Sequence, residues 1–269
     1  IIVFLKHSLM ILCYPCTQKF KLQLIRLSYQ LLLLLLILTY SIDCFAELTG
    51  KLSSSFTGAT DYIWRGYSKS DGKPVLQANI DYEFKSGIYL GTFASAVNFA
   101  DHGFENRSTA EFRPYLGFAY KLSDDWRFNT AWTRYIYDGK IFGQVSDYNE
   151  FYLYGHFRDL LTVNLNFSEN SYRQHHMSFN SEITGRYPIT DSIEISGTFG
   201  YNDQRKVLRY DYLYWTSGLT IHFSRNIGID VRYYGGSYAS SEKEASFSQW
   251  QFHPHVVDNR VVFSITVGF

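Results

Sequence analysis

The chain has 269 residues, of which 46% are hydrophobic and 19% charged, so it holds enough apolar material for a substantial core and is not a disordered chain. The 25 Lys and Arg residues balance the 25 Asp and Glu residues, which leaves no excess of basic charge to bind a nucleic-acid backbone. Aromatic residues make up 19% of the chain, including 23 Tyr and 22 Phe, and this composition favours β-strands.

The N-terminal segment, residues 1–46, has the pattern of a secretory signal peptide. Basic residues that include Lys21 and Arg26 precede a leucine-rich run at 31–38, and small residues follow, ending at Ala46. This order is typical of export signals, and the apolar run is shorter than the roughly 20 residues that a membrane-spanning helix needs. We therefore expect cleavage after Ala46. A lipoprotein signal at Cys44 is less favoured, because Asp43 replaces the small residue expected before a lipid-bearing cysteine.

All three cysteines, Cys13, Cys16 and Cys44, precede the expected cleavage point, so the mature chain carries no thiol. Cys13 and Cys16 form a C-x-x-C pair, but they lie upstream of the leucine run rather than between a strand and a helix, which argues against a redox site. Because the chain begins with Ile1 rather than Met, we expect the natural start to lie a short way inside the printed sequence.

From Gly50 onward, apolar and polar residues alternate with the period of two that characterises β-strands. In the segment 76–84, for example, Leu76 and Ile80 share one face while Asp81 and Glu83 share the other. Turn residues divide this region into twelve predicted strands, at 51–64, 75–84, 88–97, 107–120, 126–137, 148–158, 161–167, 177–187, 192–201, 211–223, 227–234 and 256–269.

The connections between the predicted strands alternate between short turns and longer loops. The longer ones fall at 65–74, 98–106, 138–147, 168–176, 202–210 and 235–255. In an antiparallel up-and-down sheet with an even number of strands, this alternation places both chain ends and all short turns at one rim.

Alternation alone also fits a secreted β-sandwich, so three further features decide between the two. Most predicted strands reach the roughly 9–11 residues that cross a tilted bilayer. Aromatic residues such as Trp64 and Trp126 gather near strand ends, as in an interfacial girdle. The last strand alternates strictly and ends on Phe, a pattern that we expect the outer-membrane assembly machinery to read, with one face formed by Val261, Phe263, Ile265, Val267 and Phe269.

These features predict an all-β fold over residues 47–269: a transmembrane antiparallel up-and-down β-barrel of ten to twelve strands, most consistent with twelve, in the outer membrane of a Gram-negative bacterium. The expected surroundings of its apolar face are the lipids of that membrane.

The stretch from Thr60 to Pro74, TDYIWRGYSKSDGKP, followed by Gln77, Asp81-Tyr82 and the segment 87–92, resembles the opening of the TorF-type porin family of proteobacterial outer-membrane proteins. The motif-like part covers 60–97, and the length and lack of cysteines of the mature chain agree with the family. The resemblance implies an outer-membrane barrel. It implies no substrate and no functional residues.

The predicted inner face carries charges of both signs, and our leading hypothesis is a passive channel for small polar solutes or ions. The candidate lumen-lining residues are Asp81, Glu83, Glu111, Arg113, Arg127, Glu182, Arg186, Glu194, His222, Asp230 and Arg232. Opposed charges across a lumen set the selectivity of a pore. At twelve strands, the interior is intermediate between filled eight-stranded barrels and wide porins, which predicts a narrow or partly plugged pore. The same charges also fit a filled interior in which they only pair with one another.

Two loops attract attention in a channel of this kind. The loop 65–74 contains the turn Asp71-Gly72-Lys73-Pro74 and is a candidate extracellular ligand loop. The longest loop, 235–255, either folds into the lumen as a constriction or projects outward, and the sequence does not choose between these.

Two other functions stay open beside the channel. A barrel that conducts nothing and binds a partner through its loops has the same pattern. A barrel lipid hydrolase is less favoured, because the chain has no G-x-S-x-G motif. We expect no catalytic, cofactor-binding or metal-binding residues, since the pairs His175-His176 and His253-Pro254-His255 lack the spacing of metal ligands on one face of a strand.

Overall fold

The computed structural model describes residues 50–241 and 256–269. The predicted signal peptide at 1–46 lies outside the described residues, as do His253, His255 and the part of the predicted loop 235–255 that follows Ser241. What the sequence indicates about these segments therefore stays a prediction.

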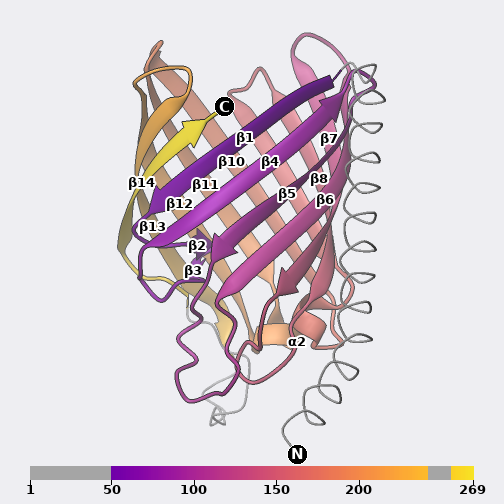
Figure 1. Cartoon of the computed structure of the whole chain (residues 1–269), viewed down its shortest axis with the longest axis vertical. Helices are drawn as coiled ribbons and strands as arrows, with labels where there is room; N and C mark the ends of the chain where they lie inside the picture. Colours follow the sequence, from indigo (N-terminus) through magenta and orange to yellow (C-terminus); the bar gives the residue numbers. More distant parts are fainter. Residues whose placement is uncertain (1–49, 242–255) are drawn as a thin grey trace, which may run out of the picture. The chain divides into compact units, whose positions relative to one another are not determined.

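The described residues form a closed antiparallel barrel of twelve strands, in which each strand pairs with its neighbours in the chain and the first pairs with the last (Figure 1). The barrel strands are β1 (Gly50–Ala59), β4 (Val75–Phe84), β5 (Ile88–Ala96), β6 (Ala110–Lys121), β7 (Trp126–Tyr137), β8 (Tyr148–Phe157), β9 (Leu161–Ser168), β10 (Ser178–Thr190), β11 (Ile193–Asp203), β12 (Tyr210–His222), β13 (Ile227–Ser241) and β14 (Arg260–Gly268).

The barrel closes between β1 and β14. Phe56 faces Val267 across this seam, and Phe269 donates its backbone N–H to the carbonyl of Ser54 at 2.8 Å. The rings of Phe56 and Phe269 meet edge to face, with their centroids 6.3 Å apart. The C-terminal strand, predicted from its strict alternation, is thus one of the two strands that seal the barrel.

The predicted fold class, the number of strands and the alternation of short turns with long loops are confirmed. Figure 1 shows the C-terminus at the rim that carries the short turns, as an up-and-down barrel requires. The segment 235–241, predicted as part of a loop, instead extends β13 to Ser241.

The largest difference concerns the predicted strand 51–64. The barrel strand β1 ends at Ala59, and the chain then forms a separate two-stranded hairpin of β2 (Ile63–Trp64) and β3 (Tyr67–Ser68). The two residues between these strands, Arg65 and Gly66, have φ values of 47° and 81°. Positive φ at both positions is the geometry of a tight type I′ hairpin turn, which glycine adopts at little cost.

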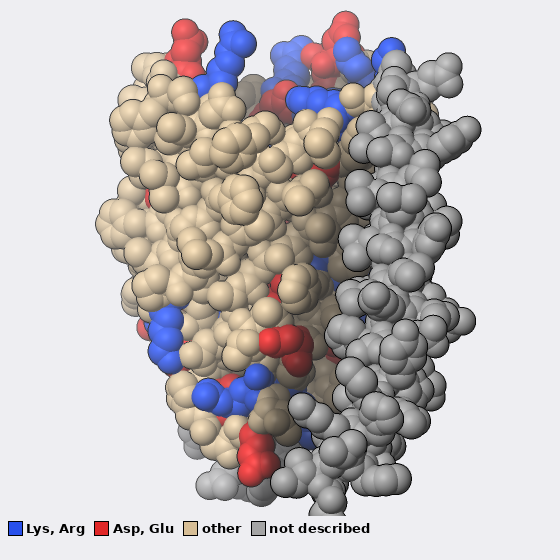
Figure 2. Space-filling model, viewed as in Figure 1, with Lys and Arg blue, Asp and Glu red and all other residues tan. Residues whose placement is uncertain are grey.

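The outside of the barrel is apolar and exposed. Leu76 is 77% exposed, Phe56 59% and Phe263 54%, and every barrel strand except β12 carries at least one exposed large hydrophobic residue. In Figure 2, Lys, Arg, Asp and Glu gather toward the two ends of the visible face, and a broad band between them is largely free of charge. An apolar area of this extent is far larger than soluble monomers expose, which indicates an apolar environment.

The buried core lies inside the barrel. It is rich in tyrosine and includes Tyr62 and Tyr67 from the hairpin, Tyr135 and Tyr212 from the wall, and Tyr172 from the loop between β9 and β10. In the described part of the chain, the helical elements are η1 (Ser171–Arg173) and α2 (Arg205–Leu208), each of one turn and each in a long loop. Within the described residues, no helix is long and apolar enough to cross a membrane.

Candidate functional site

The segment 60–74, here called the lumen hairpin, folds into the barrel instead of extending from its rim. Its base is closed by Asp61, whose carboxylate accepts hydrogen bonds from Ser68 Oγ (2.5 Å) and Ser70 Oγ (2.7 Å). Arg260 of β14 donates to the second oxygen of Asp61 at 2.8 Å. The backbone N–H of Lys69 donates to the carbonyl of Tyr62 at 2.7 Å, which keeps the two arms of the hairpin together.

Two buried ion pairs fix the lumen hairpin to one side of the wall. Arg65 donates to both oxygens of Glu150 on β8, at 2.7 and 3.1 Å. Lys69 donates to Glu111 on β6 and to the hydroxyl of Tyr137 on β7, the latter at 3.3 Å. Glu111 is also paired with Arg113 at 3.2 Å. Removal of one partner from such a pair leaves an uncompensated buried charge, so the hairpin is strongly held.

Aromatic rings surround these cations. The guanidinium of Arg113 lies 3.8 Å from the ring centroid of Phe93 and 4.7 Å from that of Trp64. Arg65 lies over the same indole at 4.9 Å, and the ring of Trp64 meets Tyr135 edge to face at 6.3 Å. Cation–π contacts of this kind gain strength where water is excluded, so the rings partly offset the cost of burying the charges.

The tip of the lumen hairpin reaches the opposite wall. Gly66 accepts a hydrogen bond at 2.6 Å from the backbone N–H of Val257, a residue just before β14. A Cβ atom at Gly66 would lie 2.6 Å from the Cβ of Tyr214 on β12, so only glycine fits there. The hydroxyl of Tyr67 also bonds that of Tyr172. With contacts on β6, β8, β12 and the segment before β14, the hairpin spans the interior.

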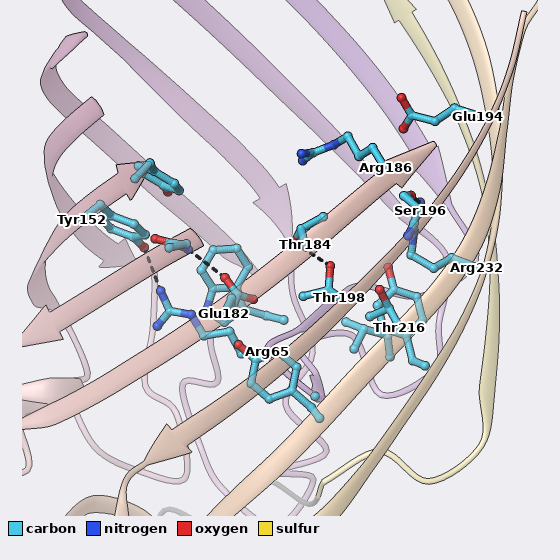
Figure 3. Close-up of a pocket in the computed structure, with 17 residues that line it drawn as sticks. Arg65, Tyr152, Glu182, Thr184, Arg186, Glu194, Ser196, Thr198, Thr216 and Arg232 are labelled. Carbon is cyan, nitrogen blue, oxygen red and sulfur yellow. Dashed lines mark hydrogen bonds between the residues drawn. The ribbon is translucent and has the colours of Figure 1, made fainter. Parts of the chain in front are cut away.

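Two cavities adjoin the lumen hairpin, and both are lined by Trp64, Tyr152 and Tyr154. The larger, drawn in Figure 3, has a volume of about 440 Å³. Its other polar lining residues come mainly from β9 to β13 and include Asn164, Glu182, Thr184, Arg186, Glu194, Ser196, Thr198, Thr216 and Arg232. The smaller, of about 270 Å³, lies against β4 to β7 and includes Asn79, Tyr89, Arg113, Tyr115 and Asn129. The interior of the barrel is therefore polar, and Trp64 lines both of its cavities.

Eight of the eleven predicted lumen residues line one of the two cavities or contact a residue that does. Glu182, Arg186, Glu194 and Arg232 line the larger cavity. Asp230 pairs with Arg232 at 2.7 Å. Arg113 lines the smaller cavity and pairs with the buried Glu111. Asp81 accepts hydrogen bonds from Tyr115 and Asn79, two residues of the same cavity.

The other three predicted lumen residues, Glu83, Arg127 and His222, are exposed and line neither cavity. All three lie beside short turns: Glu83 and His222 at the ends of β4 and β12, and Arg127 at the start of β7. At this rim the inner face of the barrel opens into water. Arg127 pairs there with Asp159 of the neighbouring turn, and the two side chains are 52% and 74% exposed.

The residues that the sequence analysis missed are those of the lumen hairpin and its anchors, above all Arg65, Lys69 and Glu150. The available indication was the presence of Glu111 and Glu150 on the inner faces of β6 and β8, together with a long loop that carries Arg65, Lys69 and Lys73. Alternation cannot reveal such a match, because the partners are 42 and 85 residues apart in sequence.

Together these features define the class of protein: a closed, twelve-stranded antiparallel barrel with an apolar exterior, a polar interior and an inward-folded hairpin, built on a porin fold. The chain belongs to the bacterial protein family of unknown function designated Gcw_chp, whose model matches residues 47–269. A comparison with curated proteins found no match.

Among solved structures, the KdgM porin matches with a TM-score of 0.50 and 12% identity, covering 81% of this chain and 99% of that one. The KdgM porin in complex with disordered oligogalacturonate gives the same values. The NanC porin matches with a TM-score of 0.47 and 10% identity over 81% of this chain and 99% of its own. At 12% identity, the similarity to KdgM shows a shared fold.

Proposed function

We propose that this barrel is an outer-membrane channel that passes small polar solutes or ions, with the lumen hairpin as its constriction. The observation that carries the proposal is the polar cavity of about 440 Å³ inside a barrel whose exterior is apolar. A barrel that served only as a scaffold has no need of water-accessible charges in its interior, whereas a channel uses them to set selectivity.

Placement in the outer membrane is supported by the barrel itself. The exposed apolar band matches lipid, and closure of the sheet removes the unpaired edges that a bilayer does not tolerate. The outward residues of β14, Val261, Phe263 and Ile265, are each about half exposed, which leaves them free for the assembly machinery to read. The likeness of 60–97 to the TorF-type porins and the export signal predicted at 1–46 agree with this location.

The solute class is proposed as small, polar and water-soluble. The fold shared with the KdgM porin, a protein solved with oligogalacturonate, agrees with passage of a hydrophilic solute. The buried lumen hairpin narrows the route, so we expect a small unitary conductance compared with that of wide 16-stranded porins.

Planar-bilayer recording of the purified barrel tests the proposal. The wild-type protein should insert in discrete steps of low conductance. A variant in which residues 62–69 are replaced by a short Gly-Ser linker should conduct more in each step, because the linker lacks Trp64, Arg65 and Lys69. A variant with the same linker in place of residues 224–226, the exposed short turn between β12 and β13, is the control. Absence of conductance in the wild type would refute the channel.

The second candidate is a non-conducting barrel that binds a partner through its loops. It is favoured by the two buried ion pairs of the lumen hairpin, because a hairpin held by such pairs suits a permanent plug better than a partial constriction. It predicts no current from the wild type and a current only after the hairpin is replaced.

A lipid hydrolase is not proposed. His156 contacts the hydroxyl of Thr162 at 3.0 Å, as a base contacts a nucleophile, but the third group at that hydroxyl is Arg186 at 2.8 Å. A guanidinium neither accepts a proton nor orients a histidine as a carboxylate does. The contact also faces the interior, away from lipid.

A further inference from the structure

The larger cavity holds charges that the barrel itself does not neutralise. Glu182 and Arg186, both on β10, have no oppositely charged group within 4.0 Å among the described residues. Glu182 instead accepts a hydrogen bond from Asn164 at 2.7 Å, and Arg186 donates one to Thr162 at 2.8 Å. Both side chains are drawn in Figure 3, with Thr184 between them on the same strand.

The other interior cations differ in this respect. Arg65 is held by Glu150 at 2.7 Å and Arg232 by Asp230 at 2.7 Å, so neither has a free charge to offer a solute. Glu194 of β11 also lines the cavity and stands opposite Pro188 in the pairing with β10, diagonal to Arg186. The wall therefore presents a negative, a positive and a negative group in sequence, with Arg186 at the centre.

The spacing of these groups suits a solute that carries both charges. Glu182 and Arg186 are four residues apart on one strand, so they share the inner face with backbones about 13 Å apart. The long side chain of Arg186 reaches into this interval, which leaves several ångströms between the charged ends. The ammonium and the carboxylate of an amino acid or a short peptide are likewise several ångströms apart.

The lining between the two charges fits the remainder of such a solute. The hydroxyls of Thr184 and Thr198, which bond each other at 2.8 Å, lie there with Thr216 and offer donors and acceptors to a peptide group. Tyr154 and Tyr214 also line the cavity. A neutral solute would leave both charges without partners, and a simple ion would satisfy only one.

We propose that this cavity is a binding site for small zwitterions of the amino-acid and short-peptide class, with Arg186 receiving the carboxylate and Glu182 the ammonium. The inference rests on the proposed channel function and names its solute class. The cavity of about 440 Å³ lies within the range of roughly 300–1,000 Å³ usual for small-molecule sites.

Block of the channel current by a zwitterion tests the site. Glycylglycine should interrupt the ion current in a concentration-dependent manner, whereas N-acetylglycinamide, which is similar in size but uncharged, should not. Glu182→Gln and Arg186→Gln should each weaken the block by glycylglycine about tenfold, the effect of losing one charge-assisted hydrogen bond. Glu83→Gln, an exposed charge outside both cavities, should leave it unchanged.

Titration calorimetry of glycylglycine against the barrel in detergent separates the two proposals. If the wild type conducts but glycylglycine and N-acetylglycinamide act alike, or if neither cavity variant differs from Glu83→Gln, the zwitterion site is wrong while the channel stands. If the wild type does not conduct, the channel is wrong, and calorimetry then decides the site alone: binding lost in Glu182→Gln supports it, and no binding by the wild type refutes it. The heat-dependent gel shift of each variant verifies that its barrel is folded.

Discussion

The ion pair between Arg65 and Glu150 sets the position of the lumen hairpin at the scale of single residues. Its side chains are only 6% and 3% exposed, whereas those of the pair Arg127–Asp159 at the short-turn rim are 52% and 74% exposed. Removing one partner of a buried pair costs about 3–5 kcal/mol, because the other charge stays buried alone. An exposed pair contributes about 0–1 kcal/mol.

We therefore predict that Glu150→Gln releases the lumen hairpin and raises the unitary conductance, since the unpaired Arg65 gains water by leaving the lumen. Asp159→Asn, which breaks the exposed pair, should conduct like the wild type. Single-channel recording of the two variants side by side provides the measurement. A wild-type conductance for Glu150→Gln would mean that the aromatic contacts alone hold the hairpin.

Lys69 makes the position of the lumen hairpin sensitive to pH. Burial lowers the pKa of Lys69 from 10.5 to about 8, and the attraction of Glu111 only partly opposes this effect. A released hairpin would have Lys69 in water, with its ordinary pKa. Between about pH 8 and pH 10, the released form thus binds more protons than the docked form, and raising the pH favours the docked form.

The expected result is a smaller fraction of time in the high-conductance state as the pH rises from about 8 toward 10. Lys69→Met, which cannot titrate, should lose this dependence. Current recordings in matched buffers across this range test the sign. An open fraction that rises with pH in the wild type, and not in Lys69→Met, would contradict the mechanism.

At the scale of elements, the barrel strands were predictable from the sequence. A strand with one polar and one apolar face has apolar residues at every second position, so its orientation can be read from the sequence alone. Leu76, Ile80 and their partners on the other strands needed no knowledge of distant residues. The lumen hairpin was not predictable in this way. Tyr62 and Trp64 continue the alternation of β1, so the pattern runs past the true end of that strand at Ala59.

The same distinction applies to the residues of the candidate site. That Glu182, Arg186 and Arg232 face inward follows from their strand periodicity, and the structure places them at one cavity. Which charges are neutralised depends on contacts between distant segments, such as Lys69 with Glu111, and local sequence does not encode these. The position of a charge was therefore predictable, and its state of pairing was not.

The turn of the lumen hairpin gives an element-scale prediction. Gly66 has a φ of 81°, and an added Cβ would lie 2.6 Å from the Cβ of Tyr214, so Gly66→Ala strains the turn and displaces the hairpin at a cost of about 1–3 kcal/mol. Gly58→Ala on β1 is the control, because the atoms nearest to its added Cβ are 3.8 Å away. Trypsin should cleave after Arg65 and Lys69 faster in Gly66→Ala than in the wild type or Gly58→Ala. Equal rates would show that the turn tolerates the strain.

At the scale of the whole molecule, the barrel has its surfaces reversed relative to a soluble protein. Its largest exposed surface is apolar, and its buried side chains are mainly tyrosines and polar or charged residues, among them Lys69 and Glu111. A soluble sandwich would bury the apolar faces between two layers, but here the sheet closes on itself and leaves those faces outside. The proposed channel function therefore depends on the polar interior, and the apolar exterior suits insertion into lipid.

Two leucines of one strand test this reversal. Leu116 lies in the middle of β6 and is 52% exposed, and Leu122 follows the end of the same strand and is 59% exposed. In water, replacing either exposed leucine by arginine would have little effect. In a bilayer, Leu116→Arg should destabilise the barrel by about 2–4 kcal/mol and Leu122→Arg, near the interface, by about 0–1 kcal/mol. Urea unfolding of the two variants in lipid vesicles measures the difference, and equal, small effects would mean that the apolar exterior does not face hydrocarbon.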